Sequence, residues 1–485
     1  MEAPTATDFT DIQGLVVRSY GQLPAATFLL LAIRNRSKAR RRLRDILAGV
    51  TFANRRPTDH AVNLALSHHG LVRLGVDDTI LSGFSNEFRS GMVTPHKRRI
   101  LGDQGAHAPE NWLWGGPETP PVDVLLLCYG ASEATLAAEV ARITSDLPRH
   151  GLAHIHSLDT ITLPDFREHF GFRDSIGQPW IAEFDRSDER RDDAVPLGEF
   201  VLGYRNGYGL LTPRPLLEPG LDPGDRLAPD PEGSGARDLG LNGTYLVFRQ
   251  LAQDVPGFWR AQQQLAGGEH SLVRDPVHLA AKMVGRWPSG APLVLAPDQD
   301  QPDLPHMDDF LYHAKDAHGT RCPLGAHIRR THPRDSLDPE PGSERSIAFS
   351  NRHRLLRRGR AYGAPFVPGL DPQQMLDRLN EPHEPVERGL HFICLNANIG
   401  RQFEFVQHTW ADNPNFNGLR AETDPIIGHR EVFGRTQDQF RVQHDPLRCK
   451  YHPLPEFVTT RGGGYFFLPS RRALQYLFSD REPRS

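Results

Sequence analysis

The sequence predicts an α+β protein made of two similar halves, and two observations lead to this prediction. Apolar runs of strand length recur along the chain, and each is followed by a segment whose apolar residues have helical spacing. The same order of strand and helix signals occurs on both sides of a central stretch rich in proline and glycine. We therefore expect an N-terminal half at 1–211, a linker or surface insertion at 212–242, and a C-terminal half at 243–485.

The N-terminal half contains two strong strand signals. The run ATFLLLAI at 26–33 is apolar throughout but too short to cross a bilayer, and helical spacing follows it at 38–47. A second apolar run, DVLLLCYG at 123–130, precedes the amphipathic segment SEATLAAEVARITSDL at 132–147. Each pair predicts a buried strand that leads into a helix.

The C-terminal half repeats this scheme. GTYLVFRQL at 243–251 and GLHFICLNANI at 389–399 predict strands. Helices are predicted at 254–265, 278–287 and 401–410 from the spacing of their apolar residues. The stretch 212–242 between the halves has no hydrophobic period, which is why we expect a linker or insertion there.

Composition excludes several classes of protein. A hydrophobic content of 38% with 24% charged residues is typical of a globular protein, and a net charge of −4 argues against a nucleic-acid partner. The four cysteines are far apart in the sequence, so neither a zinc ribbon nor a dense disulfide framework is indicated. The N-terminal residues show no signal peptide and the chain no membrane span, so we expect a cytoplasmic protein without a membrane partner.

The segment RCPLGAHIRRTHPR at 321–334 carries the strongest chemical signal. One imidazole, His327, lies among small apolar residues and is followed by Arg329, Arg330 and Arg334. An iron porphyrin needs a neutral imidazole on the metal and cations near its two propionates. The alternatives are an ordinary core histidine, since the chain has 23, or a thiolate ligand from Cys322.

Two further segments contain polar residues in a distinctive setting. Asp174 lies in GFRDSIGQP at 171–179, where a turn or a helix N-cap is the usual role of an aspartate. Arg357 lies in LLRRGRAYG at 355–363, within an arginine-rich run that would ordinarily form a solvated basic face. Arg358 and Arg360 are alternatives to Arg357 by a shift of register.

Together these three segments resemble the dye-decolorizing peroxidase family. In that family an aspartate follows a Gly-Phe-x pair, the iron-binding histidine lies in an A-H-I-R-K/R-x-x-P-R run, and a distal arginine opens an R-R-G-x-x-Y/F-G run; the matching positions are Asp174, His327 and Arg357. The resemblance, closest to the longer members, extends to 11–33, 243–255, 280–292, 401–416 and 462–470. One departure is Ser175, which stands where the family usually has a glycine and could change the backbone angle beside Asp174.

The resemblance implies two ferredoxin-like halves with antiparallel sheets that face each other, peripheral helices, and haem held mainly by the C-terminal half. It also implies a haem peroxidase with one haem b per chain. Such an enzyme reduces hydrogen peroxide through an oxo-ferryl intermediate and oxidises phenolic, dye-like or similar one-electron donors. The residues expected to contact haem are Ser175, Ile176, Gly177, His327, Arg329, His332, Pro333, Arg334 and Arg357.

The same resemblance assigns acid–base catalysis to Asp174, a stabilising positive charge to Arg357 and iron ligation to His327. The side-chain pKa of an unperturbed aspartic acid is about 3.9, so the use of an aspartate as the base predicts an acidic activity optimum. The second ring nitrogen of a ligating histidine usually binds an acceptor. The sequence offers Asn398 or Glu404 for this role and does not decide between them.

Several weaker patterns remain open. Trp410, Tyr362 and Tyr465 could carry electrons from bulky donors, although aromatic residues mostly pack in cores. His154 and His156 lie on one face of a predicted strand and could bind a metal, but no carboxylate motif completes the site.

Two other functions compete with a peroxidase, and the sequence leaves the assembly state open. One is a haem-binding or haem-handling protein without peroxide turnover, which would need the iron ligand but not Asp174 and Arg357. The other is a non-haem α+β protein with a degenerate site, which Ser175 keeps open. An oligomer is possible, and the natural donor is not specified by the sequence.

Overall fold

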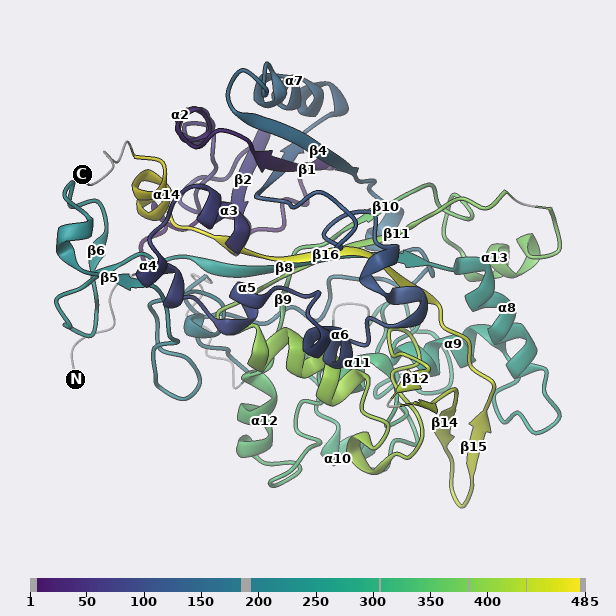
Figure 1. The fold of residues 1–485 in the computed structure, drawn as a ribbon. Helices are drawn as coiled ribbons and strands as arrows, with labels where there is room; N and C mark the ends of the chain where they lie inside the picture. The colour runs from purple at the N-terminus through teal and green to yellow at the C-terminus, as the bar shows by residue number, and fades with distance from the viewer. Residues whose placement is uncertain (1–6, 185–192, 305–306, 383, 433, 480–485) are drawn as a thin grey trace.

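A twisted antiparallel sheet runs through the whole molecule (Figure 1). The computed structural model describes residues 7–184, 193–304, 307–382, 384–432 and 434–479. The strands follow the order β10–β11–β8–β16–β2–β3–β1–β4, and β9 also pairs with β11. Their bounds are β1 Ala25–Ile33, β2 His60–Leu66, β3 Val124–Gly130, β4 Leu152–Asp159, β8 Thr244–Gln253, β9 Leu356–Arg357, β10 Arg360–Tyr362, β11 Gly389–Asn396 and β16 Val458–Leu468.

This strand order confirms the predicted pair of ferredoxin-like halves. In the N-terminal half β1 lies between β4 and β3, and β2 follows β3, which is the strand order of a ferredoxin-like unit. In the C-terminal half β8 lies in the same way between β16 and β11, with β10 beyond β11. The two halves are joined where β16 meets β2, through the single pair Phe467 and Leu66.

The predicted helices cover the outer faces of the sheet. α2 (Arg36–Leu47) follows β1, and its N-cap Asn35 accepts a hydrogen bond from the Lys38 N–H. α7 (Glu133–Thr144) follows β3 and is capped in the same way by Ser132. In the C-terminal half α8 (Val255–Ala266) and α9 (Pro276–Val284) both begin with an aspartate cap and a proline in the first turn.

Shorter helices lie in the connections. They are α1 Gly14–Val17, α3 His68–Arg73, α4 Asp78–Ser82, α5 Asn86–Ser90, α6 Pro95–Leu101, α10 His313–Asp316, α11 His327–Thr331, α12 Glu344–Asn351, α13 Pro372–Arg378 and α14 Arg471–Leu477. The helix predicted at 401–410 is present as two π-helical segments, Gly400–Glu404 and Val406–Ala411. Among the described residues, none of the helices combines the length and the apolar character that a membrane span requires.

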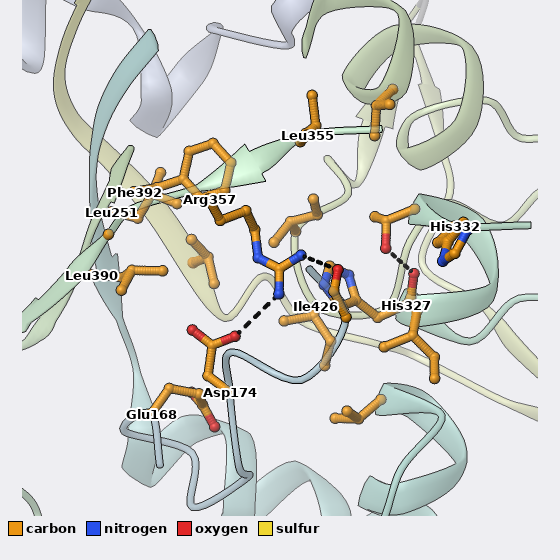
Figure 2. Close-up of a pocket in the computed structure, with 18 of the residues that line it drawn as sticks. Glu168, Asp174, Leu251, His327, His332, Leu355, Arg357, Leu390, Phe392 and Ile426 are labelled. Carbon is orange, nitrogen blue, oxygen red and sulfur yellow. Dashed lines mark hydrogen bonds and ion pairs between the residues drawn. The ribbon is translucent and has the colours of Figure 1, made fainter. Parts of the chain in front are cut away.

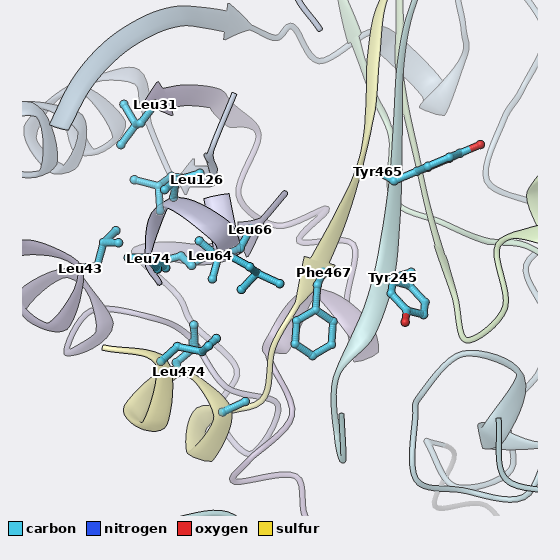
Figure 3. Close-up of a cluster of buried hydrophobic side chains, with 14 of the residues drawn as sticks. Leu31, Leu43, Leu64, Leu66, Leu74, Leu126, Tyr245, Tyr465, Phe467 and Leu474 are labelled. Atoms are coloured by element: carbon cyan, nitrogen blue, oxygen red, sulfur yellow. The ribbon is translucent and has the colours of Figure 1, made fainter. Parts of the chain in front are cut away.

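Two apolar cores hold the halves together. Even-numbered residues of β1 point toward the C-terminal half, so that the rings of Phe28 and Phe248 meet edge to face with their centroids 5.7 Å apart. This core shows that the two halves of the continuous sheet, one from each half of the chain, face each other. Odd-numbered residues of β1 pack beneath the helices, in a cluster that includes Leu31, Leu43 and Phe467 (Figure 3).

The segment 212–242 is a folded surface insertion with its own sheet of three short strands. β5 (Leu216–Leu217) and β6 (Ala228–Pro229) both pair with β7 (Arg237–Asp238). Arg214 is buried and forms 2.5 Å ion pairs with Asp230 and Asp238. Two further hairpins, β12 (Glu431–Val432) with β13 (Arg435–Thr436) and β14 (Phe440–Gln443) with β15 (Arg448–Tyr451), lie in the C-terminal half.

Candidate active site

A large cavity lies on the outer face of the C-terminal sheet, opposite the core between the two sheets. Leu246 and Phe248 of β8 point into that core, whereas Arg249, Leu251 and Gln253 of the same strand line the cavity. The centre of a water molecule can move within about 310 Å³ of this cavity. A single water needs only about 10–15 Å³ on this measure, so the space admits a large organic group.

Asp174 and Arg357 lie together in this cavity (Figure 2). Arg357 is at the end of β9, and its Nη2 lies 3.6 Å from Asp174 Oδ1 while its Nη1 donates to the Gly177 carbonyl at 3.2 Å. The Asp174 backbone N–H donates to the Phe166 carbonyl, which fixes the loop that carries the carboxylate. The two side chains that were predicted from separate motifs therefore form one pair.

Ser175 adopts the backbone conformation that its family counterpart, glycine, would favour. Its φ of +68° lies in the left-handed region, and its N–H donates to Asp174 Oδ1 at 2.6 Å. The serine therefore keeps the backbone angle beside Asp174 at some cost in strain. Its side chain is exposed and does not line the cavity, so the cavity wall does not support the predicted contact between Ser175 and the cofactor, whereas Ile176 and Gly177 do line it.

His327 is the first residue of α11, and its ring lines the cavity. Its Nδ1 lies 2.9 Å from Oδ2 of Asp424, whose side chain is fully buried. The other carboxylate oxygen of Asp424 accepts hydrogen bonds from the backbone N–H groups of Ile426 and Ile427. Within the described part of the chain, no hydrogen bond involves Nε2 of His327.

The partner of the second His327 ring nitrogen is Asp424, and neither of the two predicted candidates, Asn398 and Glu404, has this role. Asn398 accepts a hydrogen bond from the Arg401 N–H, and Glu404 pairs instead with Lys97 at 2.6 Å. Asp424 is 97 residues from His327 in the sequence, and its T-D-P-I-I-G setting indicates only a turn. No local pattern therefore pointed to it.

The pKa values of this pair follow from burial and mutual charge. Burial acts to lower the pKa of His327, but the charge and the hydrogen bond of Asp424 outweigh it and raise that pKa. For Asp424, burial acts to raise the pKa, but His327 and the backbone donors lower it. The carboxylate therefore holds the proton on Nδ1 and leaves Nε2 as the electron-pair donor toward the cavity.

Another part of the cavity wall gathers arginines. Arg286 and Arg334 share Asp308, with Nη2–Oδ1 distances of 2.6 and 2.5 Å. Arg354 is only 5% exposed, and among the described residues no carboxylate lies within ion-pair distance of it. It donates instead to Nε2 of His332 at 2.9 Å and to the Gly177 carbonyl.

Three buried arginines around the one shared carboxylate of Asp308 give this region an excess of positive charge, and neighbouring pKa values shift accordingly. Burial and the neighbouring Arg334 lower the pKa of Arg354 to about 9. Burial and nearby arginines also hold the pKa of His332 well below its usual value, so this ring is a neutral acceptor. Sequence reasoning identified His332 and Arg334 but missed Arg286 and Arg354, although Arg354 lies in the same arginine-rich run as Arg357.

Two predicted cofactor contacts are absent from the cavity. Arg329 is fully buried, and its Nη1 forms a 2.9 Å ion pair with Asp316, because a residue two positions after His327 points to the opposite side of the helix. Pro333 is buried outside the cavity, where its carbonyl accepts a hydrogen bond from the Ser336 hydroxyl. Cys322 is buried too, and burial raises its pKa to about 12, which disfavours a thiolate ligand.

The residues of the weaker patterns do not line the cavity. His154 and His156 are exposed on the edge strand β4, and among the described residues no group of three or more potential ligands could hold a metal ion. Trp410, Tyr362 and Tyr465 are buried and pack in apolar clusters or against other rings.

Comparison with known proteins decides the family. No protein-family model matches the chain. The chain is 32% identical over 444 residues to a dye-decolorizing peroxidase of Mycena epipterygia, a match that covers 84% of this chain and 74% of that protein. It is 30% identical over 495 residues to the dye-decolorizing peroxidase msp1 of Mycetinis scorodonius, covering 97% and 88% of the two chains. The chain belongs to the dye-decolorizing peroxidase family.

Solved structures agree with this assignment. An ancestral D-type dye-decolorizing peroxidase superimposes with a TM-score of 0.75 at 26% identity, over 99% of this chain and 100% of that one. A variant of the dye-decolorizing peroxidase of Auricularia auricula-judae gives a TM-score of 0.74, also at 26% identity, over 97% and 100%. This dye-decolorizing peroxidase is therefore an enzyme that acts on hydrogen peroxide, and its family consists of haem enzymes.

Proposed function

We propose that this dye-decolorizing peroxidase binds one haem b per chain, with His327 as the iron ligand and with Asp174 and Arg357 acting on peroxide. The observation that carries this proposal is that all three side chains, predicted from distant motifs, line one cavity. A haem-handling protein without turnover would need only the ligand. The paired Asp174 and Arg357 favour the enzyme, as does the family.

The residues of the cavity fit a haem. Nε2 of His327 is available to a metal, and the Asp424 carboxylate makes the imidazole a stronger electron donor. Arg354 is a buried cation without a carboxylate partner among the described residues, so an anionic group such as a propionate would compensate its charge. Apolar side chains, as a porphyrin face requires, form much of the remaining wall and include Leu251, Leu355, Leu390, Phe392, Ile426 and Ile427.

The roles of the two distal side chains follow from their chemistry. Haem, when bound, would supply the iron at which peroxide is cleaved. Asp174 would remove the proton from one peroxide oxygen and return it to the other, which leaves as water. Arg357, with Nη2 3.6 Å from Asp174 Oδ1, would keep the carboxylate in place and stabilise negative charge on the leaving oxygen.

We further propose phenolic, dye-like or similar one-electron donors and an optimum at acidic pH. A solved dye-decolorizing peroxidase of the same fold is a complex with 2,6-dimethoxyphenol, and a phenol of this kind is the class that we expect here. The acidic optimum follows from the use of an aspartate, which ordinarily remains an available base down to about pH 4.

The substitution Asp174→Asn tests this assignment. It keeps the shape of the side chain and removes the base, so the rate at which the haem-loaded protein reacts with hydrogen peroxide should fall roughly 10²–10⁴-fold. The rate is measured by stopped-flow absorption at the haem band. Asp165→Asn removes an exposed carboxylate of the same loop and serves as the control, for which we expect no change. Equal rates in all three proteins would contradict the assignment.

A further inference from the structure

Glu168 places a second carboxyl group in the cavity beside Asp174. It belongs to the same loop, in which the Glu168 N–H donates to the Phe172 carbonyl and the Asp174 N–H donates to the Phe166 carbonyl. Figure 2 shows Glu168 next to Asp174, on the side away from Arg357. The mechanism proposed above does not use this group.

The surroundings of Glu168 supply hydrogen-bond donors but no cation. Its Oε2 accepts from the Phe170 N–H at 2.9 Å and from Nε2 of Gln253 at 2.7 Å, and its Oε1 accepts from the Phe172 N–H at 3.0 Å. Among the described residues it has no ion pair. Burial raises its pKa to about 7 in spite of these bonds, and the charge of Asp174 acts in the same direction.

Gln253 can be a partner for both protonation states of Glu168. Its Nε2 donates to the carboxylate, while its Oε1 is buried without a hydrogen-bond partner in the described structure. A half-turn of the Gln253 amide exchanges the positions of Oε1, which accepts hydrogen bonds, and Nε2, which donates them. Oε1 would then accept the O–H of a protonated Glu168, so the same amide can form a hydrogen bond with Glu168 in either protonation state.

The reduction of hydrogen peroxide to water requires protons at the site beside Asp174. Reduction of one hydrogen peroxide to two waters consumes two electrons and two protons. One-electron donors supply the electrons, and a donor with no ionisable hydrogen supplies no proton. Asp174 only moves a proton from one peroxide oxygen to the other, so with such a donor the two additional protons must come from solvent.

We infer that Glu168 supplies these protons: its carboxylic acid gives a proton to the distal site next to Asp174, directly or through water, and is then protonated again from solvent. Gln253 is the amide that stabilises the group before and after transfer. This role rests on the proposed function, because it assumes that Asp174 and Arg357 handle peroxide in this cavity. It adds a second acid to the distal site, used in the steps that consume electrons rather than in the cleavage of peroxide.

The other charged or titratable groups near Glu168 have contacts or roles of their own. Arg167 donates to the Gly171 carbonyl, and the guanidinium of Arg173 lies over the Phe166 ring. The His169 ring contacts the Tyr362 carbonyl, and burial lowers the pKa of this histidine to about 4, so it is neutral near pH 7. Asp254, next to Gln253, caps α8. Asp174 is the remaining carboxylate beside Glu168, and it acts on peroxide in the other step.

The test compares the two half-reactions in haem-loaded wild type and Glu168→Gln. Reaction with hydrogen peroxide and then reduction of the oxidised enzyme by ferrocyanide, which has no proton to lose, are followed separately by stopped flow. We expect the reduction step to slow at least tenfold in Glu168→Gln, with the peroxide step within threefold of wild type. In wild type the reduction rate should fall as pH rises through about 7, where Glu168 loses its proton, and the variant should lack this dependence.

A readout without haem accompanies the kinetics. The infrared difference between wild-type and Glu168→Gln apoprotein should contain one carboxylic C=O band that disappears as pH rises through about 7. Asp165→Asn, on the same loop, is the matched control and should match wild type in both steps. Equal slowing of both steps in Glu168→Gln would overturn the inference, because Glu168 would then only hold the loop. An unchanged reduction step would overturn it as well. Asp174→Asn tests the proposed function separately, through the peroxide step.

Discussion

Asp424 determines how His327 can act, because its carboxylate holds the Nδ1 proton from 2.9 Å. A buried carboxylate in this position gives the imidazole partial anionic character, which would stabilise the more oxidised states of an iron bound at Nε2. Of the two partners that the sequence left open, the neutral amide of Asn398 would have given the opposite tendency. The sequence therefore predicted His327 but not the partner that controls its proton.

Asp424→Asn should weaken the site in two measurable ways. Loss of the negative charge should lower haem affinity roughly 10–100-fold and should raise the reduction potential of the iron. Haem titration and spectroelectrochemistry measure the two effects. Asp412→Asn is a matched control, because Asp412 forms the analogous pair with another cavity histidine, His429, at 3.0 Å. Equal shifts in both variants would show that Asp424 has no special relation to the iron.

Ser175→Gly should stabilise the protein. The serine has a φ of +68°, a left-handed conformation that costs roughly 1–2 kcal/mol for a residue with a side chain. Glycine removes this cost but loses part of the gain, since it makes the unfolded chain more flexible. We expect a net gain of about 0.5–1 kcal/mol in the free energy of unfolding, measured by urea denaturation. A less stable variant would mean that the serine makes a compensating contact.

Among the helices and strands, those whose apolar residues follow a regular spacing were predicted from the sequence. β1 is buried along all nine residues, and its run of leucines was an unmistakable strand signal. The short strands of 212–242 were not predictable, because their few buried leucines have no regular spacing and because the ion pairs of Arg214 that help to hold them leave no apolar pattern. The helix at 401–410 was predicted correctly as helical, but its π-helical turns depend on tertiary packing and leave no periodicity signal.

The stability of the protein should depend strongly on the junction between the two half-sheets. β16 and β2 meet at one residue pair, and Phe467 packs there against Phe84 and Tyr245 (Figure 3). Phe467→Ala should therefore cost about 3–5 kcal/mol in the free energy of unfolding, measured by chemical denaturation. Leu447→Ala, at a site that is 71% exposed, is the control and should change stability little. A loss below about 1 kcal/mol in Phe467→Ala would contradict a tightly packed junction.

At the scale of the whole molecule, the site is assembled from segments that only the fold brings together. Asp174 comes from the N-terminal half, whereas His327, Arg357 and Asp424 come from separate parts of the C-terminal half. Three of these were found from sequence because each lies in a compact motif. Arg354, Asp424 and Glu168 were not, since their roles arise from burial and from contacts that sequence spacing does not encode.

Buried histidines should limit stability in acid. His169, His353 and His391 are buried, and burial lowers the pKa of each to about 4, against about 6.5 in an unfolded chain. As pH falls from about 6.5 to about 4, the unfolded chain binds protons at these sites and the folded protein does not, so stability declines across this window. Calorimetry of the holoenzyme should show Tm falling steadily over this range. A flat or rising Tm would contradict it.

The central claim, that this chain is a haem peroxidase with His327 on the iron, is tested most directly by one spectrum. The purified protein is loaded with haem, and its visible absorption is recorded before and after one equivalent of hydrogen peroxide. We expect the Soret band of histidine-ligated ferric haem and its prompt shift on addition of peroxide. A Soret band that peroxide leaves unchanged, or the absence of any Soret band, would contradict it.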